Sequence, residues 1–187
     1  MTRRLRALLG LGIGLLTTIA LPAQRKQIVR SQYPRLSQRV NTLIGTDWVG
    51  NVYPGASAPF GMVQLSPDNG RAGWDYIAGY FYPDSTIAGF SHTHLSGTGA
   101  GDLYDISFLP VTLPALDDRL THKPQAGKMG EEQAPIGIHA RFSHATEVAK
   151  AGYYAVTLEP YDIRVELTAT DRVGVQRYTF QKDADSV

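Results

Sequence analysis

Apolar and polar residues alternate strictly near the C-terminal end of the chain. Over 163–170 the apolar Ile, Val, Leu and Ala positions are separated by Arg, Glu and Thr, which is the two-residue period of a half-buried strand. A turn-forming segment follows at 171–174, and the alternation resumes over 175–180. Because 154–158 shows the same period, the sequence predicts consecutive antiparallel strands in this part of the chain.

Glycine, proline and asparagine interrupt the middle of the chain every few residues. The span 45–101 holds 11 of the 19 glycines, so helices of ordinary length do not fit between the breaks, whereas short strands do. One helical turn is predicted over 146–150. Further strands are predicted over 60–67, 76–82, 104–112 and 136–142. Many short strands with frequent turns predict an all-β fold, an antiparallel β-sandwich.

The first residues have the pattern of a secretory signal. A basic start at Met1-Thr2-Arg3-Arg4-Leu5-Arg6 precedes an apolar run over 7–21 and a small residue, Ala23. We therefore expect a signal peptide over 1–23, export to the periplasm or the exterior, and a linker over 24–39. The apolar run is too short for a comfortable membrane span, so no stable membrane insertion is expected after cleavage.

Composition excludes several kinds of protein. The chain of 187 residues has a formal net charge of +1, which argues against nucleic acid or an anionic membrane as partner. It contains no cysteine, so packing rather than disulfides or thiolate-bound zinc must hold the fold together. The strand pattern runs almost to Val187 without a closing element, and we expect the sandwich to be incomplete at that end.

The segment 90–101 carries the least generic pattern, two histidines followed by alternating glycines. On an extended backbone His92 and His94 would point to one face, with Ser91 and Thr93 on the other. Three readings follow. The histidines line a polar ligand site, they bind zinc together with Asp102, or the motif holds a sheet against a neighbouring domain without touching a ligand.

Aromatic residues are dense in the same part of the chain, while charges are few. Nine aromatic side chains and only five charged ones lie between Gly45 and Gly101. A wall of aromatic faces, amides and hydroxyls suits a neutral ligand with many hydroxyl groups, such as a carbohydrate. The alternative is that the aromatics are core residues of a tightly packed β layer, and Trp48 is expected to be one of these.

Longer motifs carry a resemblance to a known family. They are Val40-Asn41-Thr42-Leu43-Ile44-Gly45-Thr46, Pro59-Phe60-Gly61-Met62-Val63-Gln64-Leu65-Ser66-Pro67-Asp68, Gly79-Tyr80-Phe81-Tyr82, Gly89-Phe90-Ser91-His92-Thr93-His94-Leu95-Ser96-Gly97-Thr98-Gly99, Ala151-Gly152-Tyr153-Tyr154 and Val165-Glu166-Leu167-Thr168-Ala169-Thr170. This set resembles the N-terminal domain of glycoside hydrolase family 92, over residues 40–187.

The resemblance implies a fold and an activity. The family comprises calcium-dependent exo-α-mannosidases that invert configuration, many acting on α-1,2-linked mannose in N-glycans or mannan. An N-terminal sandwich of the galactose-mutarotase-like or supersandwich type packs against a C-terminal (α/α)6 barrel, which supplies the acid and base carboxylates. We therefore expect no catalytic residue and no metal ligand in this chain. Ca²⁺ is expected to be bound by the barrel, which is absent, and mannose-containing glycans are the implied partner.

The resemblance also suggests roles for particular residues at the cleft between the domains. Substrate contacts are expected from Trp74, Asp75, His92 and His94. Supporting hydrogen bonds are expected from Ser91, Thr93, Asp102 and Asp105. Asp68-Asn69-Gly70 and Pro83-Asp84-Ser85 are interpreted first as turns.

Two functions of different classes are compatible with the sequence. The chain is either the sandwich portion of an exported α-mannosidase, inactive without its barrel, or a free-standing carbohydrate-binding or interaction module without catalysis. A reading frame that continues past Val187 would favour the first, and a genuine stop codon there would favour the second.

Overall fold

The computed structural model describes residues 35–97, 103–112, 138–159 and 161–181. The chain divides into two units, Met1–Pro34 and Arg35–Val187, and everything below concerns the second. The predicted signal peptide and the linker up to residue 34 lie outside the described residues. The last linker residues form a 3₁₀ turn, η1 (Leu36–Arg39). No helix among the described residues is long and apolar enough to cross a membrane.

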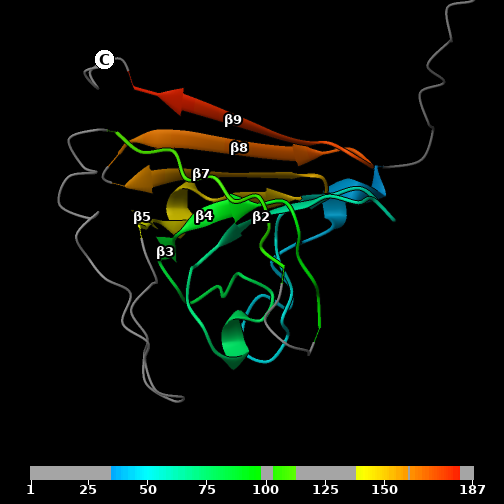
Figure 1. Ribbon diagram of the computed structural model, residues 1–187. Helices are drawn as coiled ribbons and strands as arrows, with labels where there is room; N and C mark the ends of the chain where they lie inside the picture. The colour runs from blue at the N-terminus through cyan, green and yellow to red at the C-terminus, as the bar shows by residue number, and fades with distance from the viewer. Residues whose placement is uncertain (1–34, 98–102, 113–137, 160, 182–187) are drawn as a thin grey trace, which may run out of the picture. The chain divides into compact units, whose positions relative to one another are not determined.

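The described chain consists of short strands in two antiparallel sheets, which confirms the all-β prediction (Figure 1). The smaller sheet has the order β1-β2-β4, formed by β1 (Ala56–Ser57), β2 (Gln64–Asp68) and β4 (Gly89–Ser91). The larger sheet has the order β3-β5-β7-β8-β9, and β6 also pairs with β7. Its strands are β3 (Thr86–Ile87), β5 (Ala140–Phe142), β6 (Val148–Lys150), β7 (Tyr153–Glu159), β8 (Ile163–Ala169) and β9 (Gly174–Phe180).

The predicted alternation near the C-terminal end corresponds to β7, β8 and β9. In the register of β8 and β9, Ile163 lies opposite Phe180 and Ala169 lies opposite Gly174. The hairpin between them is closed by a hydrogen bond from the Thr170 backbone N–H to the Val173 carbonyl oxygen, 2.9 Å long. The sequence predicted these strands well because one face of each is more buried than the other, most clearly in β8, which imposes a period of two.

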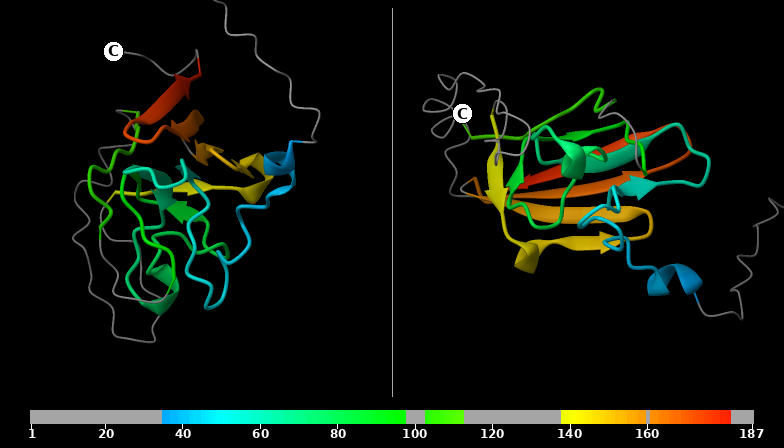
Figure 2. Two further views of the ribbon diagram at one scale, coloured as in Figure 1. Left: turned by 90° about the vertical axis from the view of Figure 1, so that its right-hand side faces the viewer. Right: turned by 90° about the horizontal axis from the view of Figure 1, so that it is seen from below.

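The two sheets pack face to face and enclose the core (Figure 2). Strands β1 and β2 of the smaller sheet both contact β8 of the larger one. The smaller sheet contributes Leu65 and Phe90, both fully buried. The larger sheet contributes the alternate residues of β7 and β8, namely Tyr154, Val156, Leu158, Ile163, Val165 and Leu167. Burial of these side chains is the main source of stability in a chain without disulfides.

Two of the predicted strands are absent. The segment 76–82 contains the end of a 3₁₀ turn, η2 (Trp74–Tyr76), and then irregular backbone, because Gly79 has a φ of 85° and its N–H bonds to the Tyr76 carbonyl oxygen. Residues 104–112 form only a single bridge, between Phe108 and Phe90. Positive φ angles at Tyr104 and Ile106 remove this segment from extended geometry.

The predicted helical turn over 146–150 is also wrong in position. A 3₁₀ turn, η3 (His144–Thr146), lies two residues earlier, where the Ser143 side chain accepts a hydrogen bond from the Ala145 N–H. Residues 148–150 form β6 instead. In β6 all three residues pair with β7. A single isolated helical turn would fix the same residues for only one backbone hydrogen bond, which is unfavourable.

Candidate functional site

The outer face of the smaller sheet carries the polar residues of the histidine motif. Phe90 and Leu65 point into the core, so their neighbours Ser66, Asp68 and Ser91 point to the other face. Ser66 and Ser91 lie opposite each other in the ladder between β2 and β4. Three loop residues, Gly79, His94 and Tyr104, lie against one another over this face. The polar side chains of the face are therefore buried beneath these loops.

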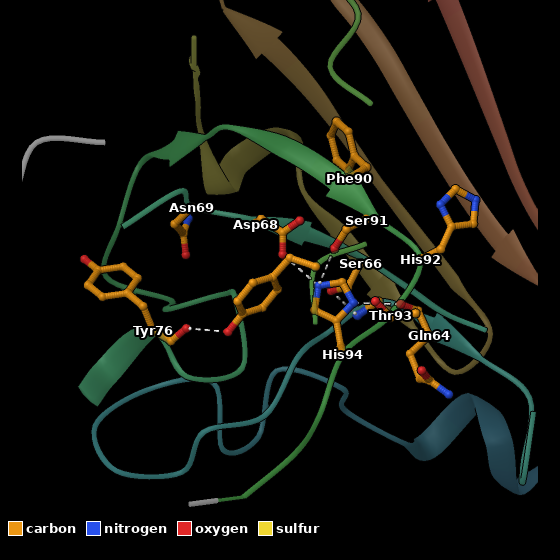
Figure 3. A network of polar contacts seen from close by, with 12 residues as sticks. Gln64, Ser66, Asp68, Asn69, Tyr76, Phe90, Ser91, His92, Thr93 and His94 are labelled. Atoms are coloured by element: carbon orange, nitrogen blue, oxygen red, sulfur yellow. Dashed lines mark hydrogen bonds and ion pairs between the residues drawn. The ribbon is translucent and has the colours of Figure 1, made fainter. Parts of the chain in front are cut away.

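His94 is fixed in that layer by both of its ring nitrogens (Figure 3). Its Nδ1 lies 2.7 Å from the carbonyl oxygen of Gln64, and its Nε2 lies 2.8 Å from Oδ1 of Asp68. Nε2 is also 3.2 Å from the Ser91 hydroxyl oxygen. The residue is only 2% exposed, and Tyr53 and Tyr104 pack against its ring. Since a carbonyl oxygen can only accept, Nδ1 is the donor to Gln64.

These contacts make His94 a structural residue of the layer rather than part of a nucleophilic triad. In such a triad the serine and the carboxylate contact different nitrogens of the imidazole. Here Ser91 and Asp68 both lie at Nε2, and Nδ1 is occupied by the backbone of Gln64. The hydroxyl of Ser91 therefore has no base positioned to activate it through a relay.

His92 points elsewhere, so the prediction that the two histidines share a face is wrong. Strand β4 ends at Ser91, and the chain bends at the next residue. The Nδ1 of His92 lies 2.8 Å from the carbonyl oxygen of Ile106, and its ring packs beside Phe108. Figure 3 shows the two imidazoles turned away from each other. They lack the common face that the zinc alternative requires.

Two of the expected supporting residues hold the neighbouring loop. The Thr93 hydroxyl donates to Oδ2 of Asp105 at 3.2 Å and accepts from the Asp105 backbone N–H at 2.9 Å. This double contact ties the histidine segment to residues 103–108. Asp102 lies outside the described residues.

Trp74 and Asp75 lie apart from the histidines, on η2, and both are exposed. Trp74 is 56% exposed, which leaves an indole face open to a ligand. In the described part of the chain, no hydrogen bond or ring contact joins either residue to His92 or His94. The predicted substrate-contacting residues thus come from two separate segments, and their contacts with substrate stay a prediction.

The expectation that Trp48 belongs to the core is wrong. Its side chain is 79% exposed, and its backbone has a φ of 54°, which is uncommon for a bulky residue. The loop that carries Trp48 is anchored by a backbone hydrogen bond, in which the Tyr82 N–H donates to the Thr46 carbonyl oxygen at 2.8 Å. The loop is thus anchored through its backbone, while the Trp48 side chain is mostly exposed.

Sequence reasoning missed the role of Asp68. It is the last residue of β2 rather than a turn residue, and its carboxylate is the partner of His94. Its Oδ1 is bonded, and the buried Oδ2 has no hydrogen-bond partner among the residues that the structure describes. Gly79 allows this approach, because a Cβ there would lie 2.5 Å from Asp68 Oδ1. The available signal was the apolar run that leads into Pro67-Asp68, which continues the strand.

A second polar network lies beside the first, around Asp84. Its Oδ1 accepts from both the backbone N–H and the hydroxyl of Thr86, as expected for a turn aspartate. Its Oδ2 pairs with Arg71 Nε at 2.5 Å and accepts from the Tyr76 hydroxyl at 3.1 Å. Burial, with the nearby Asp84 charge as a second cause, raises the pKa of Tyr76 to about 12. Tyr76 is therefore a neutral phenol at physiological pH.

The described residues do not fit a calcium site. Ca²⁺ takes six to eight oxygen ligands, usually with several carboxylates. No group of three or more His, Cys, Asp or Glu side chains converges within the described ranges. The carboxylates of Asp68, Asp84, Glu147 and Glu166 are each paired with a basic or imidazole side chain instead.

Taken together, a two-layered antiparallel sandwich with an aromatic and hydroxyl-rich loop face is the kind of domain that carries carbohydrate sites. The model of the glycosyl hydrolase family 92 N-terminal domain matches residues 39–187, and the chain belongs to this family. The resemblance noted in the sequence is thereby confirmed.

Three relatives give the comparison more detail. An uncharacterized secreted glycosidase of Arthroderma benhamiae is 30% identical over 141 residues, covering 75% of this chain and 17% of the relative. The solved family GH92 α-mannosidase BT3965 of Bacteroides thetaiotaomicron, in complex with mannoimidazole, is 42% identical. Its TM-score is 0.65, and the match covers 79% of this chain and 18% of that one. The inverting mannosidase BT2199 of the same organism is 26% identical with a TM-score of 0.50, covering 77% and 18%. The chain thus spans about a fifth of the length of these relatives.

Proposed function

We propose that this chain is the carbohydrate-contacting N-terminal domain of an exported, inverting α-mannosidase that acts on α-1,2-linked mannose in N-glycans or mannan. The observation that carries the proposal is the family match over 39–187, together with 42% identity to a solved α-mannosidase. The basic and apolar start of the sequence and the secreted relative support export.

In this proposal the catalytic carboxylates lie in the C-terminal part of the parent enzyme. An inverting glycosidase needs one carboxylic acid and one carboxylate about 6.5–9.5 Å apart, with room for a water molecule. The four ion-paired carboxylates described above serve the fold, because each is committed to a partner within the domain. Ca²⁺ would be held by that C-terminal part as well.

The contribution of this domain would be an aromatic surface for the sugar. Trp74 projects from a short turn with its indole exposed, and indole faces stack well on the apolar side of a sugar ring. Asp75 beside it is exposed and offers an acceptor for sugar hydroxyls. His94 acts indirectly here, by holding the layer beneath these loops, and His92 by holding residues 103–108.

Comparing this chain with its full-length parent tests the proposal. With calcium added, the parent is expected to hydrolyse α-1,2-mannobiose and to release β-mannose first, which NMR of the fresh product detects. The 187-residue chain is expected to show no hydrolysis. Turnover by the chain alone would contradict the location of the acid and base, and a parent that releases α-mannose would contradict inversion.

A further inference from the structure

A cavity of about 160 Å³ lies beside the two polar networks, and the proposed function does not use it. It is bounded by the end of β2 and the start of β4, by η2 with the loop to Gly79, and by residues 104–107. Six of the residues that line it are Asp68, Arg71, Tyr76, Gly79, Tyr104 and Ser107. The volume is below the ~300–1,000 Å³ of pockets for drug-sized ligands, and it suits one small ring.

The ionisable side chains on the cavity wall already have partners within the protein. Arg71 is paired with Asp84, and Asp68 is paired with His94. All four of these side chains are largely buried. A ligand with a net charge would compete with these existing pairs and would have to leave its water behind, which is costly. The wall therefore favours a neutral ligand.

The same wall offers polar groups and flat apolar surfaces side by side. Tyr76 and Ser107 are hydroxyl-bearing residues of the wall. The Tyr76 hydroxyl donates to Asp84, and its pKa of about 12, raised mainly by burial, keeps it a neutral phenol well into the alkaline range. Two tyrosine rings, Tyr76 and Tyr104, form apolar walls, while glycines leave the remaining surface close to the backbone. A small ring with several hydroxyls matches both features, whereas a purely apolar ligand would offer the hydroxyls no hydrogen bond.

We propose that this cavity is a binding site for one neutral sugar ring or cyclic polyol, separate from the exposed Trp74. Trp74 does not line the cavity, although it shares η2 with Tyr76. The inference does not depend on where the parent enzyme cleaves its substrate. It assigns to this domain a second carbohydrate site that functions without the rest of the parent.

Titration of the 187-residue chain with methyl α-mannopyranoside tests this proposal, followed by calorimetry or protein-observed NMR. The variants are Tyr76→Phe, which removes a wall hydroxyl, and Ser107→Leu, which fills the cavity from an exposed position. Each is expected to weaken binding at least tenfold. Tyr153→Phe is the matched control, because Tyr153 also donates to a carboxylate, Glu166, but does not line this cavity. This control variant is expected to bind the sugar as tightly as the unmodified 187-residue chain.

Two further arms separate this site from the alternatives. Protein-observed NMR separates the cavity from the exposed Trp74: shift changes at Tyr104 and Ser107, which line the cavity, are expected to saturate with the sugar, whereas changes confined to Trp74 and Asp75 would place the sugar on Trp74 and overturn the cavity site. Mannose 6-phosphate is expected to bind more weakly than the neutral glycoside. Tighter binding of the phosphate would mean that Arg71 recognises anions and would refute the preference for a neutral ligand. Absence of any binding to the unmodified chain would overturn the cavity site itself. None of these results depends on hydrolysis by the parent.

Discussion

His94 illustrates how a conspicuous sequence motif becomes a structural residue. Its two nitrogens are committed to Gln64 and Asp68, and its ring is enclosed by Tyr53 and Tyr104. A buried imidazole and carboxylate stabilise the fold only as a pair, because either one alone is left without its partner in a region of low dielectric constant.

Replacing His94 by Ala is therefore expected to lower the free energy of unfolding by about 3–5 kcal/mol. The same change at His92 removes a hydrogen bond from a half-exposed ring and is expected to cost about 1 kcal/mol. Urea denaturation followed by circular dichroism measures both. Equal losses for the two variants would contradict the distinction drawn between these histidines.

The sequence predicted that these residues form a polar segment, but it did not predict correctly how their side chains are oriented. It marked Ser91, His92, Thr93 and His94 as a polar cluster, but it placed the histidines on one face because it assumed that the strand continues. The strand ends at Ser91, and a period of two has no meaning beyond that point. Asp68 was missed because Asp68-Asn69-Gly70 has the composition of a turn, and partners 26 residues apart leave no local signal.

Among the elements, a buried glutamate joins the loop at 80–82 to the larger sheet. Tyr80 and Tyr154 both donate to Glu147 Oε1, at 2.8 and 2.6 Å, and His144 Nδ1 lies 2.7 Å from Oε2. His144 in turn stacks on Tyr82 with ring centroids 4.2 Å apart. Burial, and after it the Glu147 charge, raises the pKa of both Tyr80 and Tyr154 well above the usual value.

These raised pKa values predict a loss of stability in alkali. Below about pH 10 both phenols are neutral in the folded and the unfolded chain, so their contribution is complete. Above that pH the phenols of the unfolded chain ionise while the folded ones stay neutral, and stability falls as pH rises. Urea midpoints are measured between about pH 9 and pH 11. They are expected to fall more steeply with pH for the unmodified 187-residue chain than for its Tyr80→Phe, Tyr154→Phe double variant. Parallel slopes would contradict the assignment, since the remaining tyrosines are common to both.

Elements with one buried face were predictable, and loop-bound segments were not. Burial alternates along β8 and, less deeply, along the first part of β9, and the sequence shows it. Strand β7 follows the same period except that Ala155 is buried as well. The segment 76–82 contains buried residues such as Ile77, Ala78 and Tyr80, although its backbone is not extended. Its apolar composition therefore suggested a strand that does not form. The long-range hydrogen bond from Tyr80 to Glu147 decides its path.

At the scale of the whole molecule, family membership was recognisable because the motifs are long and specific. The cavity proposed as a sugar site was not, since its walls come from segments that meet only in the fold. Trp74 and Trp48 are both exposed, whereas only one of them was expected to be.

The account is tested most directly by replacing Trp74 in the full-length parent and measuring kcat/KM on an α-1,2-mannoside. Loss of the indole face in Trp74→Ala is expected to reduce kcat/KM about fivefold, as estimated from about 1 kcal/mol of stacking and its conversion to rate. Trp74→Phe, which keeps an aromatic face, should recover most of the activity, and Val175→Ala on the exposed side of β9 is the control. An unchanged kcat/KM in Trp74→Ala would contradict the claim that this domain contacts the sugar through Trp74.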